Sequence, residues 1–221
     1  VWDDEHIRSL LVSIARSFSV GAVMLLENGG EAKFKMRPVE GLDPAKYPPE
    51  KVEKLILDGQ QRLTSLTQVL ILNQPVTTRD EKKRPIERYY YIDIEKALLG
   101  PEHYDEAIIG VAADKTLRTN FGKDITLDLR SPEQEFKAFH FPCNQILNRD
   151  KWENGLISFD SAKFQRYMEF RQNVLDAFKE YDVPVVELKK NNRKEAVCLV
   201  FEKVNTGGVP LSVFELITAT Y

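Results

Sequence analysis

The sequence predicts an α+β fold, with a small mixed sheet, flanking helices and a more helical second half. In the first half, short apolar runs alternate with segments of helical periodicity. One long amphipathic helix is expected from residue 160 to about 181. The 221 residues, 43% of them hydrophobic, can bury a sizeable core. We expect an α+β core at 1–150 and a helical extension with one returning strand at 151–221 packed on it, with a single structural unit as the alternative.

The first half is expected to open with a helix, because acidic residues at 3–5 precede apolar positions at helical spacing. These positions are Ile7, Leu10, Leu11, Ile14 and Phe18. Runs rich in β-branched and aliphatic residues predict strands at 20–27, 52–57, 87–93 and 107–113. A weaker strand at 139–146 would be confined to a sheet edge by Pro142. The polar and charged segment 77–84 is assigned to no strand.

Beyond the long helix, a short strand is expected at 183–188 and a helix at 193–204. The run Asn-Thr-Gly-Gly at 205–208 is expected to end that helix, since Asn and Gly readily take the left-handed cap conformation. Ser212 and Glu215 predict a capping box for a further helix.

Composition excludes several classes of protein. Lys and Arg number 31 and Asp and Glu 34, so the net charge of −3 argues against a nonspecific nucleic-acid binder. Cys143 and Cys198 lie among apolar neighbours and are expected to be buried thiols in a reducing cytoplasm. No apolar run reaches the roughly 20 residues that span a bilayer, and a cytoplasmic protein without membrane association is expected. Because it begins at Val1, the chain is expected to be a fragment.

Several kinds of catalytic site are not expected. The three histidines, His6, His103 and His140, are scattered and form no Cys/His metal pattern. Neither cysteine has an adjacent basic residue that would activate a nucleophilic thiol. The sequence also lacks a P-loop, so any nucleotide chemistry is expected at the strand-to-helix junction around residues 58–62.

That junction, Leu57-Asp58-Gly59-Gln60-Gln61-Arg62-Leu63-Thr64, can bind an anion. Free backbone N–H groups at a helix start, together with the helix dipole, attract negative charge. Gly59 would let a phosphate approach the backbone, and Arg62 adds a bidentate fork suited to phosphate. Thr64 supplies a hydroxyl in the first turn.

Asp58, Gln60 and Gln61 are the remaining candidates for chemistry. Asp58 can orient Arg62 or hold a magnesium ion that bridges phosphates, while Gln60 and Gln61 can position a water or contact a base. A purely structural alternative is equally consistent with the residues: Asp58 caps the helix, Gly59 makes a tight turn and Arg62 pairs with a surface acid.

A resemblance decides between these interpretations. The run Asp-Gly-Gln-Gln-Arg-Leu-Thr-x-Leu at 58–66 resembles the signature of domain-of-unknown-function family 262, the amino-terminal half of GmrSD-type restriction enzymes. The opening segment, Val1-Trp2-Asp3-Asp4 with 20–23, and the late segment 201–212 are similar to the family in the same order. The middle, from about 77 to 160, has no convincing match.

The resemblance implies a ParB- and sulfiredoxin-like core. In this family that core binds, and in some members hydrolyses, a nucleoside triphosphate (GTP or ATP) with magnesium, coupled to DNA cleavage in phage defence. It implies catalytic roles for Asp58, Gln60, Gln61 and Arg62, and places Asn205 in the nucleotide pocket beside its alternative role as a helix cap. Family members also carry a Gln-Arg pair just upstream of Trp2, so the expected site would be incomplete in this fragment.

The expected partners are a nucleotide, DNA through the full-length protein, and a carboxy-terminal nuclease domain or subunit, while homodimerisation is left open. The competing hypotheses are a noncatalytic DNA-recognition or nucleotide-sensing module, and a pure assembly scaffold. Two basic runs stay open between a solvated turn and a nucleic-acid contact. They are Lys189, Lys190, Arg193 and Lys194, and Arg79, Lys82, Lys83 and Arg84.

Overall fold

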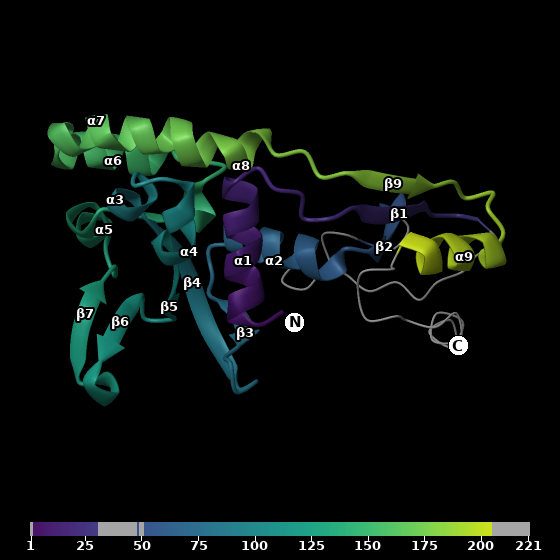
Figure 1. The fold of residues 1–221 in the computed structure, drawn as a ribbon, viewed down its shortest axis with the longest axis horizontal. Helices are drawn as coiled ribbons and strands as arrows, with labels where there is room; N and C mark the ends of the chain where they lie inside the picture. Colours follow the sequence, from purple (N-terminus) through teal and green to yellow (C-terminus); the bar gives the residue numbers. More distant parts are fainter. Residues whose placement is uncertain (1, 31–47, 49–50, 205–221) are drawn as a thin grey trace. The chain divides into compact units, whose positions relative to one another are not determined.

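A computed structural model describes residues 2–30, 48 and 51–204 (Figure 1). The chain forms two compact units: unit 1 comprises residues 1–20 and 61–182, and unit 2 comprises 21–60 and 183–221. Each of these units is made of two separate segments of the chain, whereas the predicted division at residue 150 separates two continuous segments. The predicted division therefore stays a prediction. The α+β class is confirmed, because each unit combines a sheet with helices.

Unit 1 is built on β4 (Pro85–Asp93), which pairs antiparallel with three strands. One edge of β4 pairs with β5 (Ile108–Ala112). The other edge pairs with β3 (Val76–Arg79) and then with β8 (His140–Pro142). β3 is a strand that the sequence did not predict. Its four residues, Val-Thr-Thr-Arg, include one apolar side chain, and the alternate burial of Val76 and Thr78 is visible only in the structure. The predicted edge strand around Pro142 is shorter than expected and passes into a 3₁₀ turn.

Helices pack against this sheet and bury one continuous apolar cluster. The first is α1 (Asp4–Ala15), which Asp3 caps by accepting from the His6 backbone N–H; Phe18 lies beyond its end and is exposed. The others are α2 (Gln60–Leu70), α3 (Ile94–Ala97), α4 (Tyr104–Ala107), α5 (Pro132–Ala138) and α6 (Asp150–Phe159). Short 3₁₀ turns lie at Pro101–His103, Asn120–Gly122 and Cys143–Gln145.

The long helix expected at 160–181 is confirmed as three consecutive helical segments. Asp160 caps α7 (Ser161–Phe170), a π-helical turn follows at Arg171–Leu175, and α8 (Asp176–Glu180) completes it. α6 and α7 lie side by side (Figure 1), with Trp152 and Tyr167 in ring contact between them. α6 itself was not predicted from the sequence.

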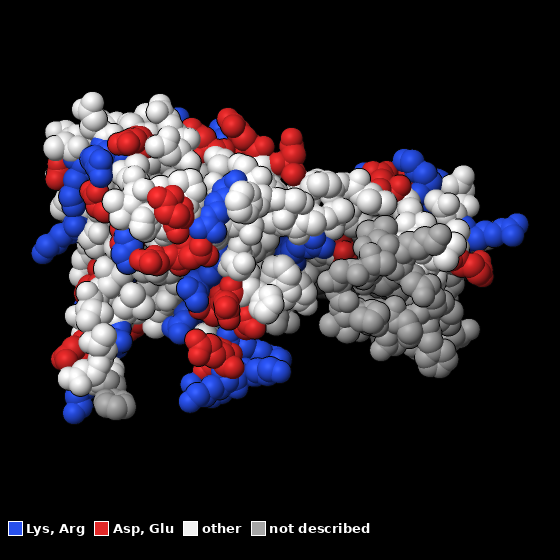
Figure 2. Space-filling view, in the orientation of Figure 1, with Lys and Arg blue, Asp and Glu red and all other residues white. Residues whose placement is uncertain are grey.

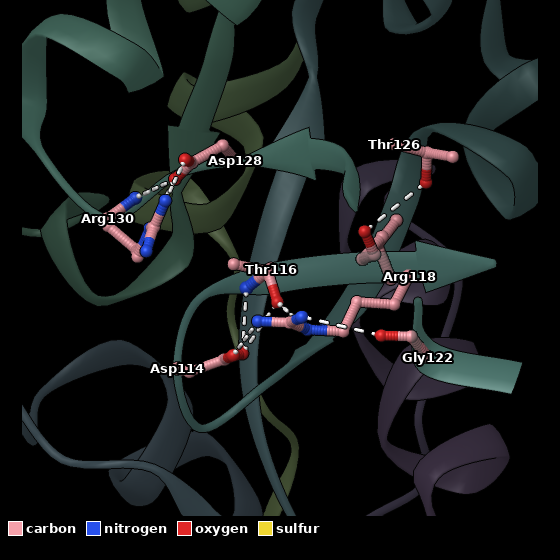
Figure 3. Close-up of polar contacts among 8 residues, drawn as sticks. Asp114, Thr116, Arg118, Gly122, Thr126, Asp128 and Arg130 are labelled. Atoms are coloured by element: carbon pink, nitrogen blue, oxygen red, sulfur yellow. Dashed lines mark hydrogen bonds and ion pairs between the residues drawn. The ribbon is translucent and has the colours of Figure 1, made fainter. Parts of the chain in front are cut away.

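A two-stranded hairpin, β6 (Thr116–Thr119) with β7 (Asp124–Asp128), was also missed. It is held mainly by polar contacts (Figure 3). Arg118 bonds Asp114 at 3.0 Å and the Gly122 carbonyl at 3.4 Å. Arg130 forms two bonds to Asp128, at 2.6 and 2.9 Å, and these hold the pKa of the Asp128 carboxyl down at about 2. Apolar Ile125 and Leu127 alternate with polar residues in β7, and Leu117 and Leu127 pack against a small buried cluster of Tyr91, Val111 and Leu129, so a strand signal was present.

Unit 2 contains a mixed sheet in the order β2-β1-β9. β1 (Val23–Glu27) pairs antiparallel with β2 (Lys54–Asp58) and parallel with β9 (Val185–Leu188). The predicted helix after the strand at 183–188 is confirmed as α9 (Lys194–Val204). Ion pairs cross the exposed face of this sheet, where Glu187 binds Lys54 at 2.9 Å and Lys189 at 3.1 Å.

A buried carboxyl ties β4 to α5 and α6. Glu135, 3% exposed, accepts from the Tyr91 hydroxyl at 2.9 Å and from Trp152 Nε1 at 3.1 Å. Burial raises the pKa of Glu135 above its usual value, and the two hydrogen bonds offset this only in part. The folded chain therefore favours the protonated carboxyl, and this stabilisation is lost as the pH rises from about 4.5 through the folded-state pKa.

We therefore expect the stability advantage of the native chain over Glu135→Gln to be largest below about pH 4.5 and to shrink as the pH rises. Urea unfolding of both proteins between pH 4 and pH 8 measures it. Glu133→Gln is the control: the pKa of exposed Glu133 is lowered, so its contribution should instead fall at acid pH. A pH-independent difference for Glu135→Gln would contradict the assignment.

Candidate functional site

The junction between β2 and α2 turns within one residue. β2 ends at Asp58 and α2 begins at Gln60, so Gly59 alone makes the turn, with φ at +85° and its backbone buried. A side chain is strained in this left-handed conformation, which explains glycine at this position. The predicted succession of strand, glycine and helix is confirmed.

The start of α2 has the features of an anion-binding helix terminus. The first N–H groups of a helix have no partner within it, and the first turn of α2 holds no acidic residue that would compete for them. Gln60 and Gln61 are exposed there, and Gln60 Nε2 donates back to the Ile56 carbonyl at 2.8 Å. An anion would therefore meet amide donors and glutamine side chains at this end of the helix.

Arg62 is half-buried and its guanidinium is held by the backbone. Its Nη1 donates to the Val20 carbonyl at 2.6 Å. The same segment is fixed by Tyr181, whose hydroxyl accepts from the Val20 N–H at 2.9 Å and donates to the Phe18 carbonyl at 2.6 Å. Arg62 therefore has a structural anchor as well as its expected role with a ligand. No sequence signal identifies Val20 or Tyr181, which lie far along the chain from Arg62.

Asp58 and Thr64 are half-buried on either side of the turn. Asp58 is paired with Met24 across the sheet, next to an irregularity in the register of β1 and β2. Such bulges reorient side chains at the end of a strand. Within the part of the chain that the structure describes, no three or more His, Cys, Asp or Glu side chains gather to hold a metal, so a magnesium role for Asp58 stays a prediction that depends on bound phosphates.

Other predicted positions are settled or fall outside the structure. Asn205 lies outside the described residues, as do Ser212 and Glu215. Cys143 and Cys198 are buried, as predicted, and burial raises the pKa of the Cys143 thiol, which disfavours the nucleophilic thiolate. No helix in the described ranges is long and apolar enough to cross a membrane.

A shallow depression in unit 1 was not anticipated. Its lining includes the polar residues Gln68, Gln74, Asn144 and Arg88 as well as Tyr89 to Tyr91 and Pro142. Its volume is about 240 Å³ with open solvent included, which is below the usual range of ligand pockets. It therefore carries no functional assignment.

Comparison with known proteins gives two similarities. The model of the family described as "GmrSD restriction endonuclease, N-terminal domain" matches residues 1–221. The chain is also similar to Uncharacterized protein MJ0686 of Methanocaldococcus jannaschii, with 26% identity over 229 aligned positions. That alignment covers 100% of this chain and 37% of the relative, so the chain spans well under half of the relative's length.

The backbone of Gly59 gives a direct test of the junction. We expect Gly59→Ala to lower the free energy of unfolding by at least about 1 kcal/mol, because alanine resists its left-handed conformation. Gly29→Ala is the comparison variant: with φ at +89° and nothing within 4 Å of an added Cβ, it should lose a similar amount from backbone strain alone, so any larger loss at Gly59 reports packing around the turn. Chemical denaturation measures both. A Gly59→Ala variant as stable as the native chain would contradict the turn geometry.

Proposed function

We propose that this chain, which belongs to the family of the GmrSD restriction endonuclease N-terminal domain, binds a nucleoside triphosphate at the start of α2. Family membership, expected from the motif at 58–66, is confirmed over residues 1–221. It also implies the ParB-like fold for this α+β chain. Beyond family membership, the proposal names the ligand, a nucleoside triphosphate, and its binding site at the start of α2, and binding experiments can test both.

The observation that carries the proposal is the one-residue turn into α2. Gly59 turns the chain directly into α2, whose first N–H groups belong to the exposed Gln60 and Gln61 and have no competing carboxylate in the first turn. Polyphosphates suit such a site, because each phosphate oxygen accepts from N–H groups and gains from the helix dipole. Gln60 and Arg62 also bond backbone carbonyls, so the proposal depends on the exposed helix start and on the charge of Arg62 beside it.

Each side chain of the motif has a proposed role. Arg62 binds a phosphate through guanidinium N–H groups, and its bond to Val20 holds the side chain in place for this. Thr64 adds a hydroxyl, and Asp58 would hold magnesium beside the phosphates. Gln60 and Gln61 contact the base or a water, and Asn205, outside the described residues, completes the pocket. Magnesium would supply charge neutralisation at the phosphates.

We further propose that nucleotide hydrolysis controls DNA cleavage by a nuclease domain or subunit outside this chain. The family description names a restriction endonuclease, and the chain covers 37% of its relative, which leaves length there for further domains. The proposed partners are therefore the nucleotide, DNA through the full-length protein, and that nuclease.

Binding is the first experiment, because it does not depend on turnover. We expect titration calorimetry of ATP and of GTP, each with magnesium, to show saturable binding of at least one nucleotide to the native chain. Arg62→Ala should lose the binding, since it removes the phosphate-binding fork. Arg62→Lys, which keeps the charge and loses the fork, should bind more weakly than the native chain.

The matched control is Arg16→Ala. Arg16 is likewise a partly buried arginine of unit 1 that donates to a backbone carbonyl, with Nε 2.8 Å from Pro101 O. Removing the Arg16 side chain should remove a similar amount of packing as Arg62→Ala does, and it should leave nucleotide binding intact. Equal affinity in the native chain and a folded Arg62→Ala variant would overturn the proposed site.

One observation favours a second candidate, a nucleotide sensor without turnover. Gln60 donates its side-chain amide to the Ile56 carbonyl, so one of the two glutamines expected to position water is engaged with the backbone. Phosphate release measured at saturating nucleotide separates the candidates. Steady release supports hydrolysis, whereas binding without release supports the sensor.

A further inference from the structure

The turn that joins β3 to β4 gathers basic side chains at the surface of unit 1. Arg79, Lys82, Lys83 and Arg84 are all exposed. Figure 2 shows Lys and Arg side chains clustered at the free end of this hairpin, with acidic groups beside them. We infer that the β3–β4 turn is a docking surface for the phosphate backbone of duplex DNA. The inference does not require nucleotide binding at Arg62.

Hydrogen bonds close the backbone of the turn. Asp80 N–H donates to the Arg84 carbonyl at 3.0 Å, and Lys83 N–H donates to the Asp80 carbonyl at 2.8 Å. The Asp80 carboxylate also accepts from the backbone N–H groups of Lys82 and Arg84, each at 2.9 Å. The two lysines are therefore presented on a preformed turn, so little backbone entropy is lost when they meet a phosphate.

Charge in the turn is only partly compensated. Arg84 is neutralised by Asp80, with Nε and Nη2 at 2.7 and 2.6 Å from one carboxylate oxygen. For Arg79, Lys82 and Lys83, the structure shows no ion pair with any residue in its described ranges, and Glu81 is the one remaining carboxylate of the turn. Asp3, at the start of α1, also interacts electrostatically with Lys83. Three cations against the carboxylates of Glu81 and Asp3 leave a small local excess of positive charge on a chain whose net charge is −3.

Lys83 occupies a position that favours glycine. Its φ is +60°, in the left-handed region, where the three-residue hairpin loop usually places Gly or Asn. Ser17, Lys115, Asn120 and Phe139 also have positive φ, so the conformation by itself does not mark a functional residue. A lysine there is less stable than a glycine would be, which makes Lys83→Gly an informative variant.

The neighbouring hairpin β6–β7 provides an internal contrast. Its arginines are engaged inside the hairpin, Arg118 with Asp114 and Arg130 with Asp128 (Figure 3). Their charges stabilise local structure. Lys82 and Lys83 show no comparable acidic partner among the residues that the structure describes, so they are available to an external anion.

Duplex DNA is the polyanion that fits best. The chain belongs to a restriction endonuclease family, whose substrate is DNA, and phosphate contacts by Lys and Arg position such proteins without reading sequence. Three phosphate contacts, from Arg79, Lys82 and Lys83, would make the logarithm of the DNA-binding constant fall against the logarithm of the salt concentration with a slope of about −2.7. A weak contact of this kind would add to those made by the rest of the full-length protein.

The test measures binding of the native chain to a fluorescent DNA duplex across a salt series, without nucleotide. We expect the double variant Lys82→Gln/Lys83→Asn to bind the duplex more weakly. The magnitude of its slope against the logarithm of the salt concentration should be smaller by about 2. Asparagine is chosen because it tolerates the left-handed conformation. The charge-matched control, Lys151→Gln/Lys179→Gln, removes two exposed lysines from α6 and α8 and should bind like the native chain.

A third variant separates function from stability. Lys83→Gly should raise the melting temperature, because it removes the strain, and should weaken DNA binding at the same time. The inference is overturned if the native chain shows no salt-dependent binding to the duplex, if both double variants lose affinity equally, or if polyglutamate displaces the DNA as well as unlabelled duplex does. Nucleotide is absent throughout, so failure of the site at Arg62 cannot produce any of these results.

Discussion

The backbone pairing of β4 with three other strands is the interaction on which unit 1 depends. β5 occupies one edge of β4 while β3 and β8 share the other, so a single strand organises the whole sheet. Its side chains extend this role, because Ile92 is fully buried in the main apolar cluster and Tyr91 reaches the buried Glu135 of α5. Trp152 of α6 bonds the same carboxyl, so one strand connects the sheet to two helices.

The motif at 58–62 has a structural role and also has features that suit a phosphate-binding site. Gly59 turns the chain from strand to helix, and Arg62 donates a hydrogen bond to the Val20 carbonyl, so both residues have a structural role. The same features suit a phosphate site, since a turn without a Cβ and an anchored guanidinium need little reorganisation to bind an anion. Structural and ligand-binding interpretations of the motif are therefore compatible, and only a variant that keeps the fold while losing the ligand distinguishes them.

Prediction from sequence succeeded where the apolar periodicity was long enough to recognise and failed mainly for short elements. The helices α1 and α2 and the strands β1 and β2 carry clear apolar patterns, and their predicted positions are confirmed within a few residues. The hairpin β6–β7 was missed although Ile125 and Leu127 alternate with polar residues, and Ser131 and Gln134 form a capping box that could have revealed α5. The motif was found from its residues, but the Arg62 bond to Val20 joins distant positions that no local pattern links.

The parallel pairing of β1 with β9 sets an order in which the chain can fold during synthesis. β1 and β2 both leave the ribosome early, but β9 follows only after residues 61–182 have been made. Unit 1 is therefore complete before the sheet of unit 2 can acquire its third strand. Until then the edge of β1 that later receives β9 has unpaired backbone groups, which is the condition under which strands pair with other chains. Premature termination before Val185 would leave that edge permanently open, and such truncated chains are expected to aggregate.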